Sequence, residues 1–119
     1  MTTTEPTEAG VAPAKPLRLA DGAELTALLQ NHDRVLVEFY TANCGICASM
    51  EPVLGLVARE SDAVVAMVNP GNDMRLTEQF AIRSVPTLIL FRDGEEVARL
   101  ADGFQGVEAV LDFIDEQSE

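Results

Sequence analysis

The sequence predicts an α/β domain with a central mixed β-sheet of four to five strands and helices on both faces. Short apolar runs alternate with amphipathic segments from residue 17 onward, which is typical of strands alternating with helices. An Asp93-Gly94 pair separates the last two apolar runs and favours an antiparallel hairpin. The chain has 119 residues, 47% of them apolar, which fits one domain around one core.

The first half of the domain is predicted from apolar spacing. We expect a short strand at residues 17–19 and a helix near residues 21–30 that Asp21 caps. Residues 35–40 are apolar on both faces, as expected of a central parallel strand covered on each side. A helix over residues 44–60 follows, with these side chains at core-facing intervals: Ile46, Cys47, Met50, Val53, Leu54 and Val57.

The second half continues the alternation. We expect a strand at residues 63–69, a short helix at residues 73–81 that buries Leu76 and Phe80, and the two hairpin strands at residues 86–92 and 95–101. Gly103 and Gly106 interrupt the chain before a last helix. Its predicted apolar stripe consists of Val107, Val110, Leu111 and Ile114.

The N-terminal segment differs in composition from the rest. Residues 1–16 have hardly any bulky apolar side chain, so we predict a disordered tail and a folded domain over residues 17–119. There is no apolar stretch of about 18 residues and no apolar block after a charged start, so we expect a cytoplasmic protein.

The charge is strongly acidic, with 20 Asp and Glu against 8 Lys and Arg and a net charge of −12. Such a charge argues against binding to nucleic acid or to anionic membranes. Because dissolved salt screens like-charge repulsion, we expect a halophile's protein. The alternative is an ordinary acidic protein.

The two cysteines form the sequence Cys44-Gly45-Ile46-Cys47, directly after the predicted central strand and at the start of a helix. A three-residue separation brings both sulfurs to one side of the helix. The free N–H groups and the positive end of the helix dipole favour a thiolate on Cys44, the expected nucleophile. A static disulfide or half of a zinc site remains the alternative, although zinc usually needs four ligands and His32 is the single histidine.

Several short motifs, in this order and at this spacing, resemble the thioredoxin family. They are Phe39-Tyr40, Cys44-Gly45-Ile46-Cys47, Met50-Glu51-Pro52, Ile82-Arg83-Ser84-Val85-Pro86-Thr87, Phe91-Arg92-Asp93-Gly94 and Gly103. The resemblance covers about residues 17–117 and implies the thioredoxin fold.

The resemblance implies a role for each cysteine and for Pro86. Cys44 resembles the attacking thiolate, and Cys47 the buried thiol that resolves the mixed disulfide. Pro86 resembles the cis-proline that lies opposite the dithiol in this family. With Val85 it would leave a backbone edge that pairs with an extended substrate. The alternative is a trans proline that begins a strand.

Glu38 lies in the predicted central strand, where burial would raise its pKa. The family usually has Asp at the matching position, where it helps to deprotonate the resolving cysteine. The resemblance therefore implies that Glu38 accepts the proton of Cys47. The alternative is that Glu38 points to solvent.

A small apolar docking patch is expected around the dithiol. The stretch at Gly103-Phe104 resembles the loop that flanks the dithiol in this family, and Tyr40, Ile46 and Val85 would complete the patch. The alternative for Phe104 is a place in the core.

Four positions depart from the family pattern. Asn43 stands where the family usually has Trp, and Ile46 replaces the proline between the cysteines. Ala48 and Met67 stand where basic residues are common. These departures leave the substrate choice and the reduction potential open.

The predicted function is a thiol–disulfide oxidoreductase that reduces protein disulfides through Cys44 and Cys47. The resemblance implies a thioredoxin-reductase-like electron donor and no bound cofactor. We expect no metal because the chain offers few ligands, and a monomer because it has no obvious dimerisation stripe. One alternative is a non-catalytic binding or redox-sensing module with the same fold. Another is a disulfide oxidase or isomerase.

Overall fold

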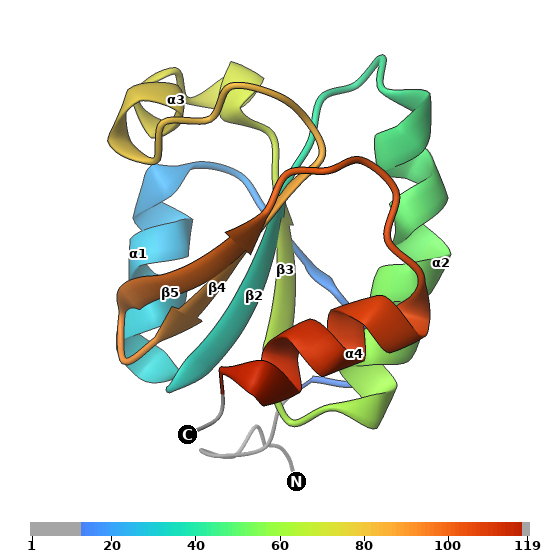
Figure 1. Cartoon of the computed structure of the whole chain (residues 1–119). Coiled ribbons are helices and arrows are strands. Elements are labelled where there is room, and N and C mark those ends of the chain that lie inside the picture. Colours follow the sequence, from blue (N-terminus) through green and yellow to red (C-terminus); the bar gives the residue numbers. More distant parts are fainter. Residues whose placement is uncertain (1–12, 118–119) are drawn as a thin grey trace, which may run out of the picture.

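The computed structural model describes residues 13–117 and contains a five-stranded sheet with the order β1-β3-β2-β4-β5 (Figure 1). The strands are β1 (Leu17–Leu19), β2 (Arg34–Phe39), β3 (Val64–Val68), β4 (Thr87–Arg92) and β5 (Glu95–Leu100). Strand β3 is parallel to β1 and β2, whereas β4 is antiparallel to β2 and β5. The predicted mixed sheet is confirmed, and β2 is its central strand.

Helices cover both faces of the sheet, as predicted (Figure 1). They are α1 (Gly22–Asn31), α2 (Gly45–Glu60), α3 (Arg75–Gln79) and α4 (Val107–Glu116), and a short 3-10 turn η1 (Pro70–Asn72) precedes α3. Helices α1 and α3 lie on one face, and α2 and α4 lie on the other. Each face therefore has its own apolar core.

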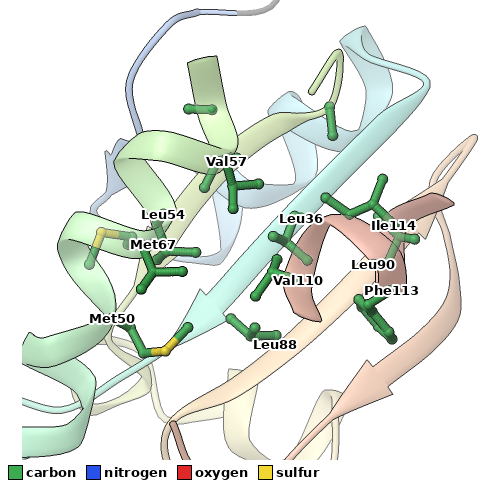
Figure 2. Packing of buried hydrophobic residues seen from close by; sticks show 14 residues of the cluster. Leu36, Met50, Leu54, Val57, Met67, Leu88, Leu90, Val110, Phe113 and Ile114 are labelled. Atoms are coloured by element: carbon green, nitrogen blue, oxygen red, sulfur yellow. The ribbon is translucent and has the colours of Figure 1, made fainter. Parts of the chain in front are cut away.

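The core under α2 and α4 holds the longest helix against the central strands (Figure 2). Its largest members are Leu36, Met50, Leu54, Met67, Leu88, Leu90, Phe113 and Ile114. One expectation was wrong here. Ile46 is 49% exposed, not core-facing, because the first turn of α2 extends beyond the end of the sheet (Figure 1). Phe113, which the predicted stripe of α4 left out, is buried as well.

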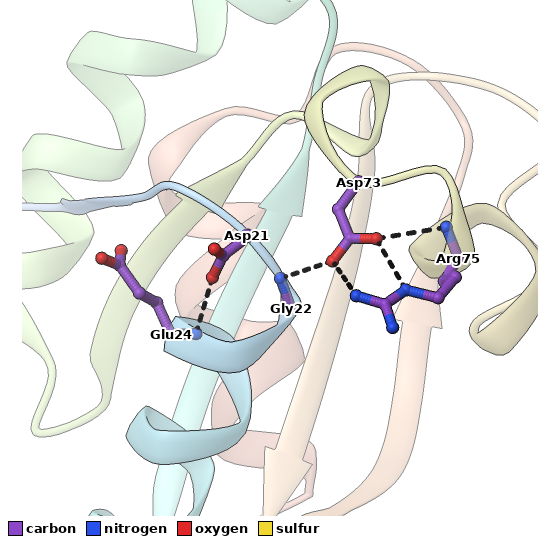
Figure 3. A network of polar contacts seen from close by, with 5 residues as sticks. All are labelled: Asp21, Gly22, Glu24, Asp73 and Arg75. Carbon is purple, nitrogen blue, oxygen red and sulfur yellow. Dashed lines mark hydrogen bonds and ion pairs between the residues drawn. The ribbon is translucent and has the colours of Figure 1, made fainter.

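The core under α1 contains a row of aromatic rings. Phe80 packs against Phe39 and Phe91, with both ring centroids 5.6 Å from its own. Phe80 is half-buried, and Leu76 is buried as predicted. The carboxylate of Asp73 accepts a hydrogen bond from the N–H of Gly22 at 3.0 Å, which joins the start of α1 to the segment before α3 (Figure 3).

Local signals at element ends are confirmed. The Asp21 side chain caps α1 by accepting a hydrogen bond from the N–H of Glu24 at 3.0 Å (Figure 3). Asp93 and Gly94 both have positive φ (52° and 85°), the backbone of a tight hairpin turn between β4 and β5.

Residues 1–12 of the predicted tail at residues 1–16 lie outside the described residues. Residues 13–16 precede β1 without forming a helix or strand. Within residues 13–117, none of the helices has the length and apolar character required to span a membrane.

Candidate active site

The dithiol lies at the N-terminus of α2, just past the end of the central strand β2. Cys44 is the N-cap residue, and its sulfur accepts a hydrogen bond from the N–H of Cys47 at 3.0 Å. The two residues form a disulfide with a Cα–Cα distance of 5.2 Å. Cys44 is half-buried and Cys47 is only 2% exposed, so an incoming molecule can reach the first sulfur far more easily than the second.

Pro86 lies close to the dithiol, although 41 residues separate Cys44 from Val85 in the chain. The Val85–Pro86 peptide bond is cis, so the alternative of a trans proline was wrong. The carbonyl oxygen of Val85 is 3.9 Å from the Cys44 sulfur. The hydroxyl of Thr87 donates a hydrogen bond to the carbonyl of Ser84 at 2.7 Å, which closes the turn that leads into β4. A half-buried backbone carbonyl thus faces the reactive sulfur.

Glu38 lies in β2 between Met67 of β3 and Leu88 of β4, and it is fully buried. Side chains alternate along a strand, so Glu38 shares the α2 face with Leu36, a member of that core. Neither carboxylate oxygen has a hydrogen-bond partner among the described residues. The alternative in which Glu38 points to solvent was therefore wrong.

The pKa of Glu38 is raised to about 7, because burial disfavours its charged form. The positive charge of Arg18 opposes this rise in the pKa. A carboxyl group with such a pKa can both hold and release a proton near neutral pH.

A small pocket of about 130 Å³ opens beside the dithiol. It is lined by Arg18, Tyr40, Thr41, Ala42, Cys44, Cys47, Ala48, Glu51 and Met67. A roomier pocket of about 560 Å³, next to His32 and Gly94, lies on the α1 side and has no cysteine in its lining. We assign the chemistry to the smaller pocket because both sulfurs line it.

Arg18 and Glu51 also line this pocket, although neither is among the site residues predicted from the sequence. Glu51 is four residues after Cys47 and thus lies on the same face of α2, a signal that helical spacing already contained. Arg18 belongs to β1, and only the strand order brings it to the pocket.

The expected docking patch is partly supported by exposure. Phe104 is 53% exposed, so the alternative that places it in the core was wrong, and Ile46 is exposed as well. Gly103 has a φ of 85°, a backbone conformation that glycine adopts without strain. The N–H of Gln105 donates a hydrogen bond to the Met50 sulfur at 3.4 Å, which holds this loop against α2.

Among residues 13–117, no three His, Cys, Asp or Glu side chains are grouped so that they could hold a metal ion.

The arrangement as a whole defines a class of protein. A cysteine pair at the start of a helix, a cis-proline beside it and a mixed sheet with helices on both faces are the features of a thiol–disulfide oxidoreductase. The comparison with known sequences agrees, because the profile of the Thioredoxin family matches residues 18–116. The chain belongs to the thioredoxin family. Members of this family act on protein disulfides and are reduced in turn by a reductase.

Individual relatives cover most of the chain. The thioredoxin of Mycobacterium tuberculosis (strain ATCC 25618 / H37Rv) is 35% identical over 97 residues, which are 80% of this chain and 83% of the relative. The thioredoxin of Alicyclobacillus acidocaldarius is 42% identical over 85 residues, 70% of this chain and 80% of the relative. The structure of a mutant thioredoxin from Halobacterium salinarum is similar with a TM-score of 0.85 and 36% identity, covering 92% of this chain and 96% of that one. The predicted thioredoxin fold and the thiol–disulfide oxidoreductase activity are confirmed.

Proposed function

We propose that the protein works in the reducing direction on protein disulfides, with Cys44 as the attacking sulfur and Cys47 as the resolving sulfur. The observation that carries this proposal is the difference between the two sulfurs. Cys44 is half-buried at the helix N-terminus and accepts an N–H hydrogen bond, whereas Cys47 is buried behind it. Such a hydrogen bond and the helix dipole stabilise a thiolate on Cys44.

The reaction transfers two electrons from the dithiol to the substrate. The Cys44 thiolate attacks one substrate sulfur, a mixed disulfide forms, and the other substrate sulfur leaves as a thiolate that takes up a proton. Cys47 loses its proton to Glu38 and attacks the Cys44 sulfur. The mixed disulfide breaks, the second substrate sulfur leaves, and the Cys44–Cys47 disulfide remains.

Glu38 is suited to accept this proton because its pKa of about 7 lies near the working pH of a cell. It faces the α2 side of the sheet, where Cys47 is buried, and no described residue occupies its oxygens by hydrogen bonding. This position and this pKa support Glu38 as the proton acceptor.

The substrate-binding residues in this proposal are Val85, Pro86, Ile46 and Gly103. The Val85 carbonyl lies 3.9 Å from the Cys44 sulfur, so an extended segment beside the attacked disulfide can pair with this backbone. The exposed side chains of Ile46 and Phe104 offer apolar contact nearby. Gly103 itself adds no side chain next to Phe104 in the loop before α4.

The cellular setting belongs to the same proposal. We assign the redox domain to residues 17–119 and a solubilising role to residues 1–16. The net charge of −12 favours a cytoplasm rich in salt and disfavours nucleic-acid and membrane partners. The protein would act as a monomer, with its electrons supplied by a thioredoxin-reductase-like enzyme.

The experiment equilibrates the protein in glutathione or dithiothreitol buffers of known reduction potential, which gives the potential of the Cys44–Cys47 pair. Turnover of insulin disulfides is measured in parallel. A reduction potential of about −270 mV with turnover supports the proposal. A potential of about −120 to −180 mV would instead indicate an oxidase or isomerase, and absent turnover a binding module. Cys44→Ser should abolish attack on the substrate, whereas Cys47→Ser should stop at the mixed disulfide.

A further inference from the structure

The pocket beside the dithiol contains one pair of opposite charges. Arg18 of β1 and Glu51 of α2 form an ion pair there. One guanidinium nitrogen of Arg18 also donates a hydrogen bond to the Tyr40 hydroxyl at 3.4 Å, and its guanidinium carbon lies 5.9 Å from the centre of the Tyr40 ring. Among the described residues that line this pocket, Arg18 is the only basic one.

The register of the sheet connects Arg18 with Glu38. Arg18 is paired with Met67, and Met67 is paired with Glu38, so the three residues form one row across β1, β3 and β2. Paired residues on neighbouring strands share a face of the sheet. Adjacent strands are about 4.8 Å apart, so the backbones of Arg18 and Glu38 are separated by roughly 10 Å, a distance that the long arginine side chain can shorten.

We propose that Arg18 is a positioning residue for thiol exchange: it supplies from β1 the positive charge of the pocket that Cys47 lines, and Glu51 moderates that charge. This inference rests on the proposed roles of Cys47 and Glu38. Cys47 and Glu38 together carry one negative charge both before and after the proton moves from Cys47 to Glu38. A nearby cation therefore favours the singly ionised pair, the state that can resolve the mixed disulfide, over the fully protonated pair.

The electrostatic environment of Glu38 agrees with this geometry. The charge of Arg18 lowers the pKa of Glu38, against the larger rise caused by burial. The titratable groups facing the pocket are Arg18, Tyr40, Cys44, Cys47 and Glu51, with Glu38 buried behind Met67. Ala48 and Met67 contribute no charge.

Substitutions at the two partners separate an electrostatic role from a structural one. Arg18→Gln and Glu51→Gln break the same ion pair but change the charge of the pocket in opposite directions. If the ion pair only stabilised the fold, both variants would move the pH profile of the resolving step in the same direction. If Arg18 acts through its charge, the two variants move that profile in opposite directions.

The experiment mixes the fully reduced protein with dithiobis-nitrobenzoate and follows the coloured thiolate that is released. The first release reports attack by Cys44, and the second reports resolution by Cys47. For Arg18→Gln we expect the second release to slow roughly threefold to tenfold near neutral pH and its pH profile to move to higher pH. Arg18→Lys should restore the rate to within about twofold of the parent, since it keeps the charge.

The Glu51→Gln variant should move the same profile to lower pH. Arg59→Gln is the matched control, because it removes an equal charge at the far end of α2 and should leave the profile unchanged. The differences should shrink in high salt, since the side chains of Arg18 and Glu51 are 59% and 41% exposed.

Three results would overturn the inference: shifts in the same direction for Arg18→Gln and Glu51→Gln, no rescue by Arg18→Lys, or a parent-like profile for all variants. The parent protein tests the proposed function separately. A parent that releases only one equivalent contradicts the roles of Cys47 and Glu38. A parent that releases two equivalents, with unchanged variants, contradicts the role of Arg18 alone.

Discussion

Glu38 is the residue at which stability and chemistry conflict. A carboxyl group that is fully buried without a hydrogen-bond partner destabilises the fold once it is ionised. The rise of its pKa from 4.5 to about 7 corresponds to about 3 kcal/mol of stability lost above neutral pH. A leucine there would avoid that loss but could not accept a proton.

The raised pKa of Glu38 predicts a specific dependence of stability on pH. Between pH 4.5 and about 7 the folded chain keeps the Glu38 proton that the unfolded chain has lost, so stability falls as pH rises through this window. In Glu38→Gln this fall is absent. We expect the oxidised parent and Glu38→Gln to have similar free energies of unfolding near pH 5. Near pH 8 the variant should be about 2 kcal/mol more stable than the parent. Urea unfolding at both pH values measures the difference. A gain of equal size at both pH values, or the same gain in the exposed control Glu60→Gln, would argue against burial of the charge as the cause.

Glu38→Gln should also separate the two chemical steps. Because Gln cannot accept a proton, resolution by Cys47 should slow by about tenfold or more, while attack by Cys44 should change little. Stopped-flow measurement of the two thiol releases gives both rates in one experiment. Resolution rates that match those of the parent would remove Glu38 from the mechanism.

At the scale of elements, α2 both carries the dithiol and closes one core. Its inner face contains Met50, Leu54 and Val57, which pack on the central strands (Figure 2). Its first turn projects past the sheet, which leaves Ile46 exposed and Cys44 half-buried. One helix therefore presents the reactive sulfur to solvent and is itself fixed by packing further along.

Two leucines of α2 test which part of the helix is fixed by packing. Leu54 is fully buried, whereas Leu56 is 38% exposed. Leu54→Ala should lower the free energy of unfolding by about 3 kcal/mol, since it removes buried apolar volume and leaves a cavity. Leu56→Ala should cost less than about 1 kcal/mol. Urea unfolding of the two oxidised variants gives the comparison, and equal costs would contradict the packing described for α2.

At the scale of the whole molecule, the net charge of −12 is the dominant property. The excess of acidic side chains causes repulsion within the chain, and salt weakens that repulsion. We expect the free energy of unfolding to increase as KCl rises from about 0.1 M toward molar concentrations.

A charge-reduced variant provides the control for this prediction. Replacing the exposed residues Glu95, Glu108 and Glu116 with Gln should flatten the salt dependence without disturbing the core. A parent whose stability is flat or falls with salt would contradict the interpretation as a halophile's protein. A variant with the same salt dependence as the parent would show that the stabilisation does not come from screened repulsion.

The sequence by itself determined the features that depend on neighbours along the chain. The Asp93-Gly94 turn, the Asp21 cap and the position of Cys44 at the start of α2 follow from local hydrogen bonding and backbone preference. The alternation of strands and helices follows from apolar spacing. The dithiol motif and the flanking proline also sufficed to suggest the family.

Only the tertiary structure decided which distant residues meet at the site. The row of Arg18, Met67 and Glu38 depends on the order β1-β3-β2 and on its register, and apolar periodicity specifies neither of these. The exposure of Ile46 and the burial of Phe113 depend on where the sheet ends and on what α4 covers. Local spacing gives the face of an element on which a side chain lies. Packing between elements decides what that face meets, because those contacts join segments that are far apart in the chain.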